Sequence, residues 1–228
     1  MEEEKAREIV VPGETIENRK EFIAGEGTRK EGNEIVAERF GVVDRSTKLL
    51  KVIPLSGVYI PRKGNTVIGQ VIDITFNGWF VDIRAPHLGF LTIAECGKRV
   101  IKEDLSEYYK VKDILLAKVK SVKTRSIELT MKERGLKKLD EGLIILVNPT
   151  RVPRIIGRAG SMVNLIKKET NTTIVVGQNG VIWIKGKNVE NELLAKKAIE
   201  LVSEKPFIEG LTEKVKEFLE NEKAGWKK

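Results

Sequence analysis

The chain has 228 residues, and its 41 Lys and Arg side chains outnumber its 33 Asp and Glu side chains, for a formal charge of +8. A single cysteine (Cys96) excludes an internal disulfide and fits a reducing, cytoplasmic location. One cysteine and one histidine (His87) are too few for a Cys/His zinc site. We expect neither a metal nor a cofactor, and magnesium held by carboxylates is the alternative. No apolar run approaches the roughly 18–20 residues that cross a bilayer, and the acidic first residues do not resemble a secretory signal peptide, so we expect no membrane partner.

The high charge content and the scarcity of glutamine indicate a thermophilic source. Charged residues make up 32% of the chain, and glutamine occurs only at Gln70 and Gln178. Such a composition, rich in charge and poor in thermolabile side chains, is typical of proteins that work at high temperature.

The excess positive charge lies in the last two thirds of the chain. Residues 1–60 hold 10 basic and 12 acidic side chains, residues 61–140 hold 16 and 10, and residues 141–228 hold 15 and 11. A basic surface attracts polyanions, of which nucleic acid is the commonest. A Lys-rich solvated surface without a partner explains the charge equally well.

The first 60 residues predict a small β-domain of short strands broken by turns. The apolar run 8–14 ends at a Pro-Gly turn, and the polar, Gly-rich segment 25–32 is expected to be a hairpin tip. Strands are expected to follow at 34–43 and 49–55.

Residues 61–135 predict a second β-domain. The expected strands are 66–74, 79–83, 89–93, 111–122 and 126–131. Five strands with a longer connection between the third and the fourth predict a five-stranded barrel of the OB type. A polar bridge, 135–142, is expected to follow this barrel.

Residues 142–205 combine helical and strand patterns. The expected elements are a strand at 143–147, a helical turn from 153, a helix after Ser161 as its N-cap, strands at 174–176 and 181–184, and a closing helix over 189–202. This βααββα order makes the chain a multidomain protein, mainly β plus α+β.

An apolar stripe predicts a last helix within residues 206–228. Its members are Phe207, Ile208, Leu211, Val215, Phe218 and Leu219. Such a stripe more often packs on its own domain, and contact with another protein is the alternative.

The segment 154–166 resembles the core of a KH domain. An Ile-Ile-Gly-x-x-Gly sequence ending at Gly160 stands between two predicted helices. Its two glycines let the backbone approach nucleic acid without a Cβ atom in the way, and the second helix offers N–H groups to phosphate. The candidate RNA contacts are Arg151, Arg154, Gly157, Arg158, Ala159, Gly160 and Ser161. The alternative is that the glycines only form a tight turn.

Residues 62–134 resemble the RNA-binding domain named after ribosomal protein S-one, a relative of the OB fold. Gly69-Gln70-Val71 opens the match, 77–82 corresponds to its Phe-Gly-Ala-Phe-Val-Asp region, and 127–130 corresponds to its last strand.

The RNA face of this S-one domain departs from the family pattern. Asn77, Thr92 and Lys123 stand where the family usually has an aromatic residue, a His and an Asp. Base stacking therefore falls to Trp79, Phe80 or Phe76, although strand alternation places one of the first two in the core. The candidate contacts are Trp79, Phe80, Lys98, Arg99, Lys118, Lys120, Lys123 and Arg125. For each lysine, a solvated strand face is the alternative.

The order of the domains resembles the KH-bearing RNA-binding cap subunit of the archaeal exosome over nearly the whole chain. A β-domain carrying Val10-Val11-Pro12-Gly13-Glu14 precedes the S-one domain, and the KH domain follows it. The other kind of cap subunit carries a zinc ribbon, which a single cysteine excludes. Polynucleotide phosphorylase has the KH and S-one domains in the opposite order.

This resemblance implies a binding protein and not an enzyme. Three cap subunits would sit on a hexameric ring that degrades RNA from its 3′ end by phosphorolysis, with residues 1–60 docked on the ring. The S-one and KH domains would bind single-stranded RNA through phosphate and sugar and guide it into the pore, which increases processivity. No catalytic set stands out in the sequence. The alternative is a free-standing RNA-binding or RNA-chaperone protein, for example a ribosome-associated one.

A second Gly-x-x-Gly sequence, Gly177-Gln178-Asn179-Gly180, joins two predicted strands. Its Asn-Gly pair is typical of a hairpin turn. The sequence also resembles a loop of the KH domains of exosome cap subunits, whose role there is to pack against the neighbouring domain.

Overall fold

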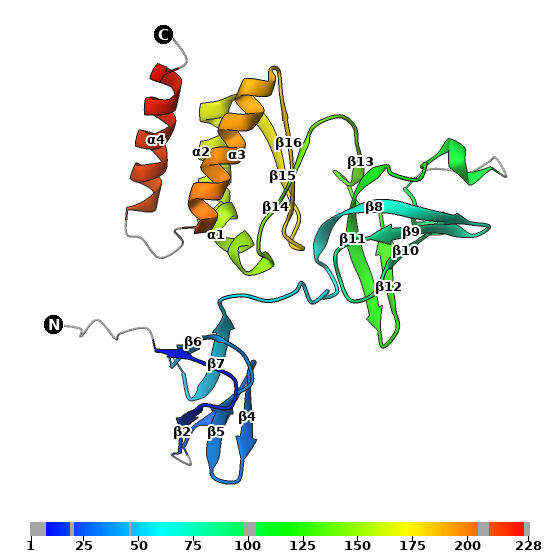
Figure 1. Ribbon diagram of the computed structural model, residues 1–228. Helices are drawn as coiled ribbons and strands as arrows, with labels where there is room; N and C mark the ends of the chain where they lie inside the picture. The colour runs from blue at the N-terminus through cyan, green and yellow to red at the C-terminus, as the bar shows by residue number, and fades with distance from the viewer. Residues whose placement is uncertain (1–7, 19–20, 46, 98–103, 205–209, 226–228) are drawn as a thin grey trace. The chain divides into compact units, whose positions relative to one another are not determined.

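The computed structural model describes residues 8–18, 21–45, 47–97, 104–204 and 210–225. The chain divides into two compact units, Met1–Gly57 and Val58–Lys228 (Figure 1). The combination of a small β unit, a barrel and an α/β layer confirms the expected class, mixed β and α+β.

Unit 1 is built from seven short strands within its described residues. They are β1 (Ile9–Val10), β2 (Thr15–Glu17), β3 (Ile23–Ala24), β4 (Thr28–Glu31), β5 (Glu34–Ala37), β6 (Gly41–Asp44) and β7 (Leu49–Pro54). They form a four-stranded sheet in the order β1-β6-β7-β3 and a three-stranded sheet in the order β2-β5-β4. The core between them includes Val10, Ile35, Leu50 and Val52.

The expected hairpin tip at 25–32 is wrong in its extent. Thr28–Glu31 is a paired strand, and only the two residues between Glu31 and Glu34 make the turn. Gly25 and Gly27 serve another purpose, since a Cβ atom on them would lie 2.7 Å from the Leu50 carbonyl oxygen and 2.9 Å from that of Val52. The glycines let this segment pass close beside β7.

Unit 2 begins with the predicted five-stranded barrel. Its strands are β8 (Thr66–Thr75), β9 (Gly78–Asp82), β10 (Gly89–Thr92), β11 (Ile114–Lys123) and β12 (Ser126–Thr130). Strand β12 closes the barrel, because it pairs in parallel with β10 and antiparallel with β11. Short 3₁₀ turns, η1 (Ile93–Glu95) and η2 (Leu105–Glu107), lie in the long connection before β11.

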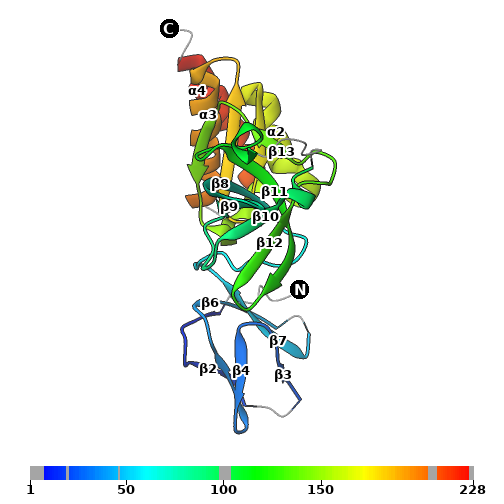
Figure 2. The same cartoon turned by 90° about the vertical axis from the view of Figure 1, so that its right-hand side faces the viewer.

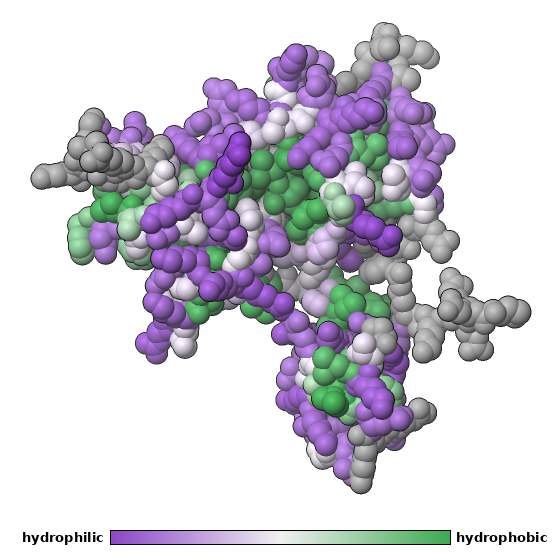
Figure 3. All heavy atoms as spheres, turned by 180° about the vertical axis from the view of Figure 1, so that it is seen from behind, coloured by the Kyte–Doolittle hydropathy of each residue, from purple (hydrophilic) through white to green (hydrophobic). Residues whose placement is uncertain are grey.

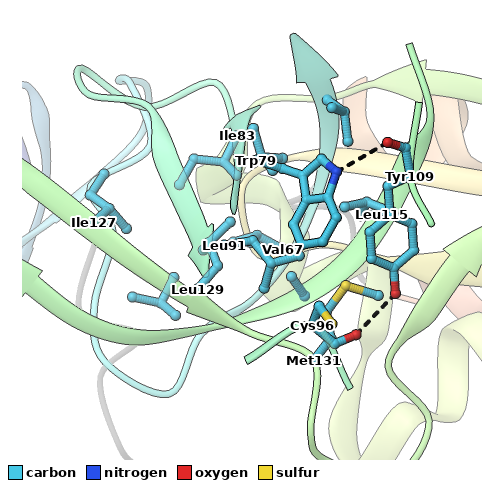
Figure 4. Packing of buried hydrophobic residues seen from close by; sticks show 14 of the residues in the cluster. Val67, Trp79, Ile83, Leu91, Cys96, Tyr109, Leu115, Ile127, Leu129 and Met131 are labelled. Carbon is cyan, nitrogen blue, oxygen red and sulfur yellow. Dashed lines mark hydrogen bonds between the residues drawn. The ribbon is translucent and has the colours of Figure 1, made fainter. Parts of the chain in front are cut away.

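An indole ring occupies the centre of the barrel core (Figure 4). Trp79 is fully buried and meets the Tyr109 ring edge to face, with ring centroids 5.2 Å apart. Its Nε1–H donates to the Tyr109 carbonyl oxygen, and the Tyr109 hydroxyl donates to the Cys96 carbonyl oxygen, both at 3.0 Å. Burial raises the pKa of Tyr109 to about 12, so this hydroxyl stays a donor at neutral pH.

The bridge after the barrel is not only a linker. Lys137–Leu139 forms a strand, β13, that pairs with β11 beside the barrel. Leu139 is buried in a cluster that joins the barrel to the following domain. The Lys-rich sequence concealed this strand, because a single inward-facing leucine gives no alternating pattern.

The βααββα order predicted for the next domain is confirmed. Its elements are β14 (Leu143–Leu146), α1 (Val152–Ile156), α2 (Ser161–Thr170), β15 (Thr172–Val176), β16 (Val181–Gly186) and α3 (Val189–Glu204), with 3₁₀ turns η3 (Pro149–Arg151) and η4 (Arg158–Gly160). The sheet has the order β14-β16-β15. In Figures 1 and 2 the helices cover one face of this sheet and the barrel lies toward the other.

The last helix, α4 (Leu211–Gly225), packs on its own domain, as the first interpretation of its stripe predicted. Leu211, Val215 and Leu219 are buried in the same core as α2 and α3. Ion pairs fasten the helix at 2.7 Å (Lys197–Glu222) and 2.8 Å (Lys223–Glu169). The remaining stripe members Phe207 and Ile208 lie outside the described residues.

The loop Gly177-Gln178-Asn179-Gly180 is both a hairpin turn and a contact with the barrel. The Asn179 amide nitrogen donates to the carbonyl oxygens of Ile68 (2.8 Å) and Ile83 (2.9 Å), and its side-chain oxygen accepts from the Ile68 N–H (3.3 Å). Gln178 exchanges two further hydrogen bonds of 2.8 Å with the backbone of Thr66. The barrel and the KH fold are therefore joined by buried polar contacts as well as by apolar packing.

Candidate nucleic-acid interface

The loop 157–160 presents its two middle residues to solvent. Gly157 and Gly160 have φ of +75° and +79°, and a Cβ atom on Gly157 would lie 2.8 Å from the backbone nitrogen of Met162. Arg158 and Ala159 are exposed, and Ala159 itself has φ of +52°. Both glycines are therefore required by the backbone, and the exposed pair is what a ligand would touch.

Ser161 does not cap helix α2 as expected. The helix begins at Ser161 itself, and Gly160 occupies the N-cap position with no side-chain hydrogen bond. The N–H groups of the first turn therefore have no serine cap, which leaves them suited to an anion such as phosphate. Arg154 on α1 is exposed near this loop in sequence, and Arg151 in η3 is half-buried.

The barrel carries an aromatic pair on its outer face. Phe80 on β9 and Phe90 on β10 are register partners, both half-buried, with ring centroids 4.9 Å apart. The prediction that Trp79 contacts RNA is wrong, because this side chain is fully buried and points into the barrel. Phe90 was missed, although its alternation with the buried Leu91 gives it the same outward phase as Phe80.

Three of the predicted basic residues of the barrel already have acidic neighbours. Lys118 pairs with Glu133 at 2.7 Å, Lys120 with Glu95 at 3.0 Å and Lys123 with Glu128 at 2.5 Å. Sequence reasoning counted the lysines but not these glutamates, which lie in η1 (Glu95), on β12 (Glu128) and after β12 (Glu133). Arg125 is exposed in the β11–β12 turn, while Lys98 and Arg99 lie outside the described residues.

Hydrogen bonds keep two of these glutamates ionised. The pKa of Glu95 is lowered chiefly by a hydrogen bond from the Thr130 side chain, and Lys120 adds to the effect. The pKa of Glu128 is lowered chiefly by the hydrogen bond from Lys123, then by that from Ser121. The outer face of the barrel thus carries ionised Lys–Glu pairs beside an aromatic pair.

The part of the chain that the structure describes offers neither a metal site nor a membrane-spanning helix. No group of three or more His, Cys, Asp or Glu side chains there could hold a metal ion. None of the helices there is long and apolar enough to cross a bilayer.

A KH fold with an exposed Gly-x-x-Gly loop, joined to an OB-type barrel with an outward aromatic pair, is the architecture of a nucleic-acid-binding protein of several modules. The profile of the KH domain matches residues 142–201, and that of the "Exosome complex exonuclease RRP4 N-terminal region" matches residues 9–46.

Whole-chain relatives extend these local matches. The exosome complex component Rrp4 of Methanothermus fervidus is 41% identical over 94% of this chain and 96% of its own length. That of Thermococcus kodakarensis is 42% identical over 94% of this chain and 86% of its own. The chain therefore belongs to the Rrp4 family of exosome components.

A solved structure agrees with this assignment. A crystal structure of a protein assigned as an exosome complex RNA-binding protein is 34% identical, with a TM-score of 0.68. The match covers 74% of this chain and 98% of that chain.

Proposed function

We propose that this chain is a non-catalytic, RNA-binding cap subunit of an archaeal exosome. Three copies would sit on a hexameric phosphorolytic ring, bind single-stranded RNA and guide it into the pore. The observation that carries the proposal is the exposed Arg158–Ala159 pair in the KH loop of a member of the Rrp4 family. Buried contacts join the KH fold to a barrel that carries an outward aromatic pair.

The proposed RNA contacts fall into two groups. The KH group is Arg151, Arg154, Gly157, Arg158, Ala159, Gly160 and Ser161, and the barrel group is Phe80, Phe90, Lys98, Arg99, Lys118, Lys120, Lys123 and Arg125. Most of them are donors suited to phosphate and sugar, which supply affinity with little dependence on sequence. The two phenylalanines add a stacking surface, which any base can use.

The first 60 residues are proposed to dock on the ring. Across the outer face of one sheet, Ile9, Val42 and Ile53 are successive register partners, and Ile9 and Ile53 are 57% and 55% exposed. Figure 3 shows apolar area on the surface of this unit. An apolar row of this kind on a nearly neutral domain supports a protein partner and not RNA.

The proposal is tested by measuring how processively the reconstituted ring degrades a long RNA with and without this chain. The double variant Arg158→Asp, Ala159→Asp reverses the charge of the KH loop and keeps both glycines, and aspartate tolerates the left-handed backbone of residue 159. We expect this variant to remain on the ring but to lose processivity on a long RNA. Replacing Gly157 would be a poorer test, because any side chain there collides with Met162.

A matched control carries the same change in charge in the connection between β16 and α3. Lys187→Asp, Asn188→Asp alters two exposed residues before α3 and should leave processivity at the wild-type level. Equal effects of the two double variants would show that net charge, and not the KH loop, holds the RNA.

Co-purification from the native lysate separates the proposal from a free-standing RNA chaperone. Recovery of the chain without ring nuclease subunits would contradict its assignment as a cap subunit but not its proposed binding of RNA. Phosphorolysis of RNA by the isolated chain would overturn the non-catalytic role.

A further inference from the structure

Three outward side chains follow one another across three adjacent strands of the barrel. Phe80 on β9 pairs in register with Phe90 on β10, and Phe90 pairs with Glu128 on β12. Register partners on neighbouring strands lie about 4.8 Å apart and point to the same face. A base stacked on the two rings would therefore have its edge beside the Glu128 carboxylate.

Glu128 is held in one orientation. Lys123 donates to its Oε1 at 2.5 Å, and the Ser121 hydroxyl donates to its Oε2 at 2.9 Å. Both oxygens therefore have fixed positions, and each keeps a further lone pair. The lowered pKa of Glu128 keeps it ionised at neutral pH, so this group only accepts hydrogen bonds.

We propose that Glu128 reads the edge of the base that stacks on Phe80 and Phe90, accepting a hydrogen bond from an amino group of cytosine, adenine or guanine and discriminating against uracil. The proposal rests on the RNA-binding function proposed above. Unstacked RNA bases are commonly held between an aromatic ring and a hydrogen bond to their Watson–Crick edge, and carboxylates accept from the cytosine N4 amino group.

Uracil fits this position poorly. Its Watson–Crick edge carries carbonyl oxygens at O2 and O4, on either side of its single N3–H donor. An acceptor-only carboxylate facing that edge meets those oxygens, and no rotation of Glu128 offers them a proton. Cytosine and uracil have similar rings for stacking, so a comparison of the two isolates the edge contact.

Glu128 could instead serve only to neutralise Lys123. In that case its removal would change the affinity for every RNA by the same factor, because an exposed lysine attracts any phosphate backbone. The ratio of two affinities therefore separates base reading from charge balance.

The test measures dissociation constants of short oligocytidine and oligouridine for the full chain by fluorescence anisotropy. We expect the wild-type protein to bind oligocytidine at least about five-fold more tightly. In Glu128→Gln the ratio should fall to about one, because the glutamine amide can donate to a uracil carbonyl as well as accept. The wild-type ratio should persist as salt rises, while both affinities fall.

Glu133→Gln is the matched control. Glu133 also pairs with a barrel lysine, Lys118, so this variant removes the same charge without touching the aromatic pair. It should raise both affinities and leave the ratio unchanged. A wild-type ratio of one, or a ratio that Glu128→Gln does not change, overturns this inference alone, whereas failure of the wild-type chain to bind either RNA overturns the proposed function.

Discussion

At the barrel surface the Glu95 carboxylate forms ion pairs with two lysines. Lys120 lies 3.0 Å and Lys132 3.5 Å from its Oε1, and the Glu95 side chain is only 15% exposed. Its pKa is lowered first by the hydrogen bond from Thr130 and then by Lys120 and Lys132, against the effect of its own burial. The charged form of Glu95 is thus favoured in the folded protein over the unfolded chain.

This pKa shift predicts how stability depends on acid. A depressed folded pKa contributes stability that is complete above the usual value of 4.5 and is lost as the pH falls through the folded pKa. Glu95→Gln should therefore be less stable than wild type at pH 7, and the difference should shrink at pH 3, as measured by denaturant unfolding. Glu204→Gln, an exposed carboxyl at the end of α3, is the control and should keep the wild-type acid dependence.

Adjacent residues Trp79 and Phe80 are expected to act on different properties. Trp79→Phe removes the hydrogen bond to the Tyr109 carbonyl and leaves a void, so we expect a loss of about 1–3 kcal/mol in the free energy of unfolding with RNA affinity unchanged. Phe80→Leu should do the reverse, weakening RNA binding by about 1–3 kcal/mol with a small change in stability. Thermal unfolding and RNA titration of both variants check the pair, and a similar loss of RNA binding in each would contradict it.

The sequence predicted that one of these two aromatic residues is buried, but not which one. Strand alternation fixes only that neighbours point to opposite faces. The choice is made by the register of β9 between β8 and β10, where Val81 and Trp79 face inward. That register depends on pairings between distant segments, which a local pattern does not contain.

Among the elements, the loop 177–180 is the clearest junction between barrel and KH fold. Asn179 is 2% exposed and makes three hydrogen bonds to barrel backbone. Asn179→Ala should leave buried backbone groups of Ile68 and Ile83 without these partners, at about 1–3 kcal/mol or more. The expected result is a lower melting temperature and faster hydrogen exchange of the Ile68 amide.

Asn164→Ala is the control for this junction. Asn164 is exposed on α2, where alanine favours the helix, so its melting temperature should not fall. If Asn179→Ala unfolds like Asn164→Ala, apolar packing alone holds the barrel to the KH fold.

The buried apolar stripe of helix α4 contributes more to the stability of its packing than the ion pairs of this helix do. Leu219 is fully buried, so Leu219→Ala should cost about 2–5 kcal/mol of unfolding free energy. Exposed ion pairs such as Lys197–Glu222 contribute under about 1 kcal/mol each. Glu220→Ala, at the exposed neighbouring position, should be nearly neutral in the same denaturant titration, and equal effects of the two changes would contradict this account.

Elements with strong periodic patterns were predictable, and those that depend on distant partners were not. The βααββα order and the five barrel strands followed from apolar spacing and turn residues. Strand β13 was not predicted, because its single buried leucine is buried only through packing against residues that are distant in the sequence. The glycines at 25 and 27 suggested a turn, whereas their role is set by β7, some 25 residues away in the sequence.

For the molecule as a whole, the distribution of net charge does not show which lysines are available to bind RNA. The barrel segment has the largest basic excess, yet Lys118, Lys120 and Lys123 each face a glutamate. Phosphate would have to compete with these glutamates, so affinity per lysine should be lower than net charge suggests. Strong binding then requires that the barrel and the KH loop hold the same RNA together.

The joint use of both modules predicts a dependence on RNA length. Because buried contacts join the barrel to the KH fold, RNA held by one module sees the other at a high effective concentration, provided that the strand is long enough to reach. Affinity for oligoadenylates of increasing length should therefore rise gently and then by roughly ten-fold or more over a narrow range of lengths. Arg158→Asp with Ala159→Asp should remove this rise, so that affinity increases only gently with length, while Lys187→Asp with Asn188→Asp should retain it. A smooth increase in affinity with length for the wild-type chain would mean that only one module binds RNA.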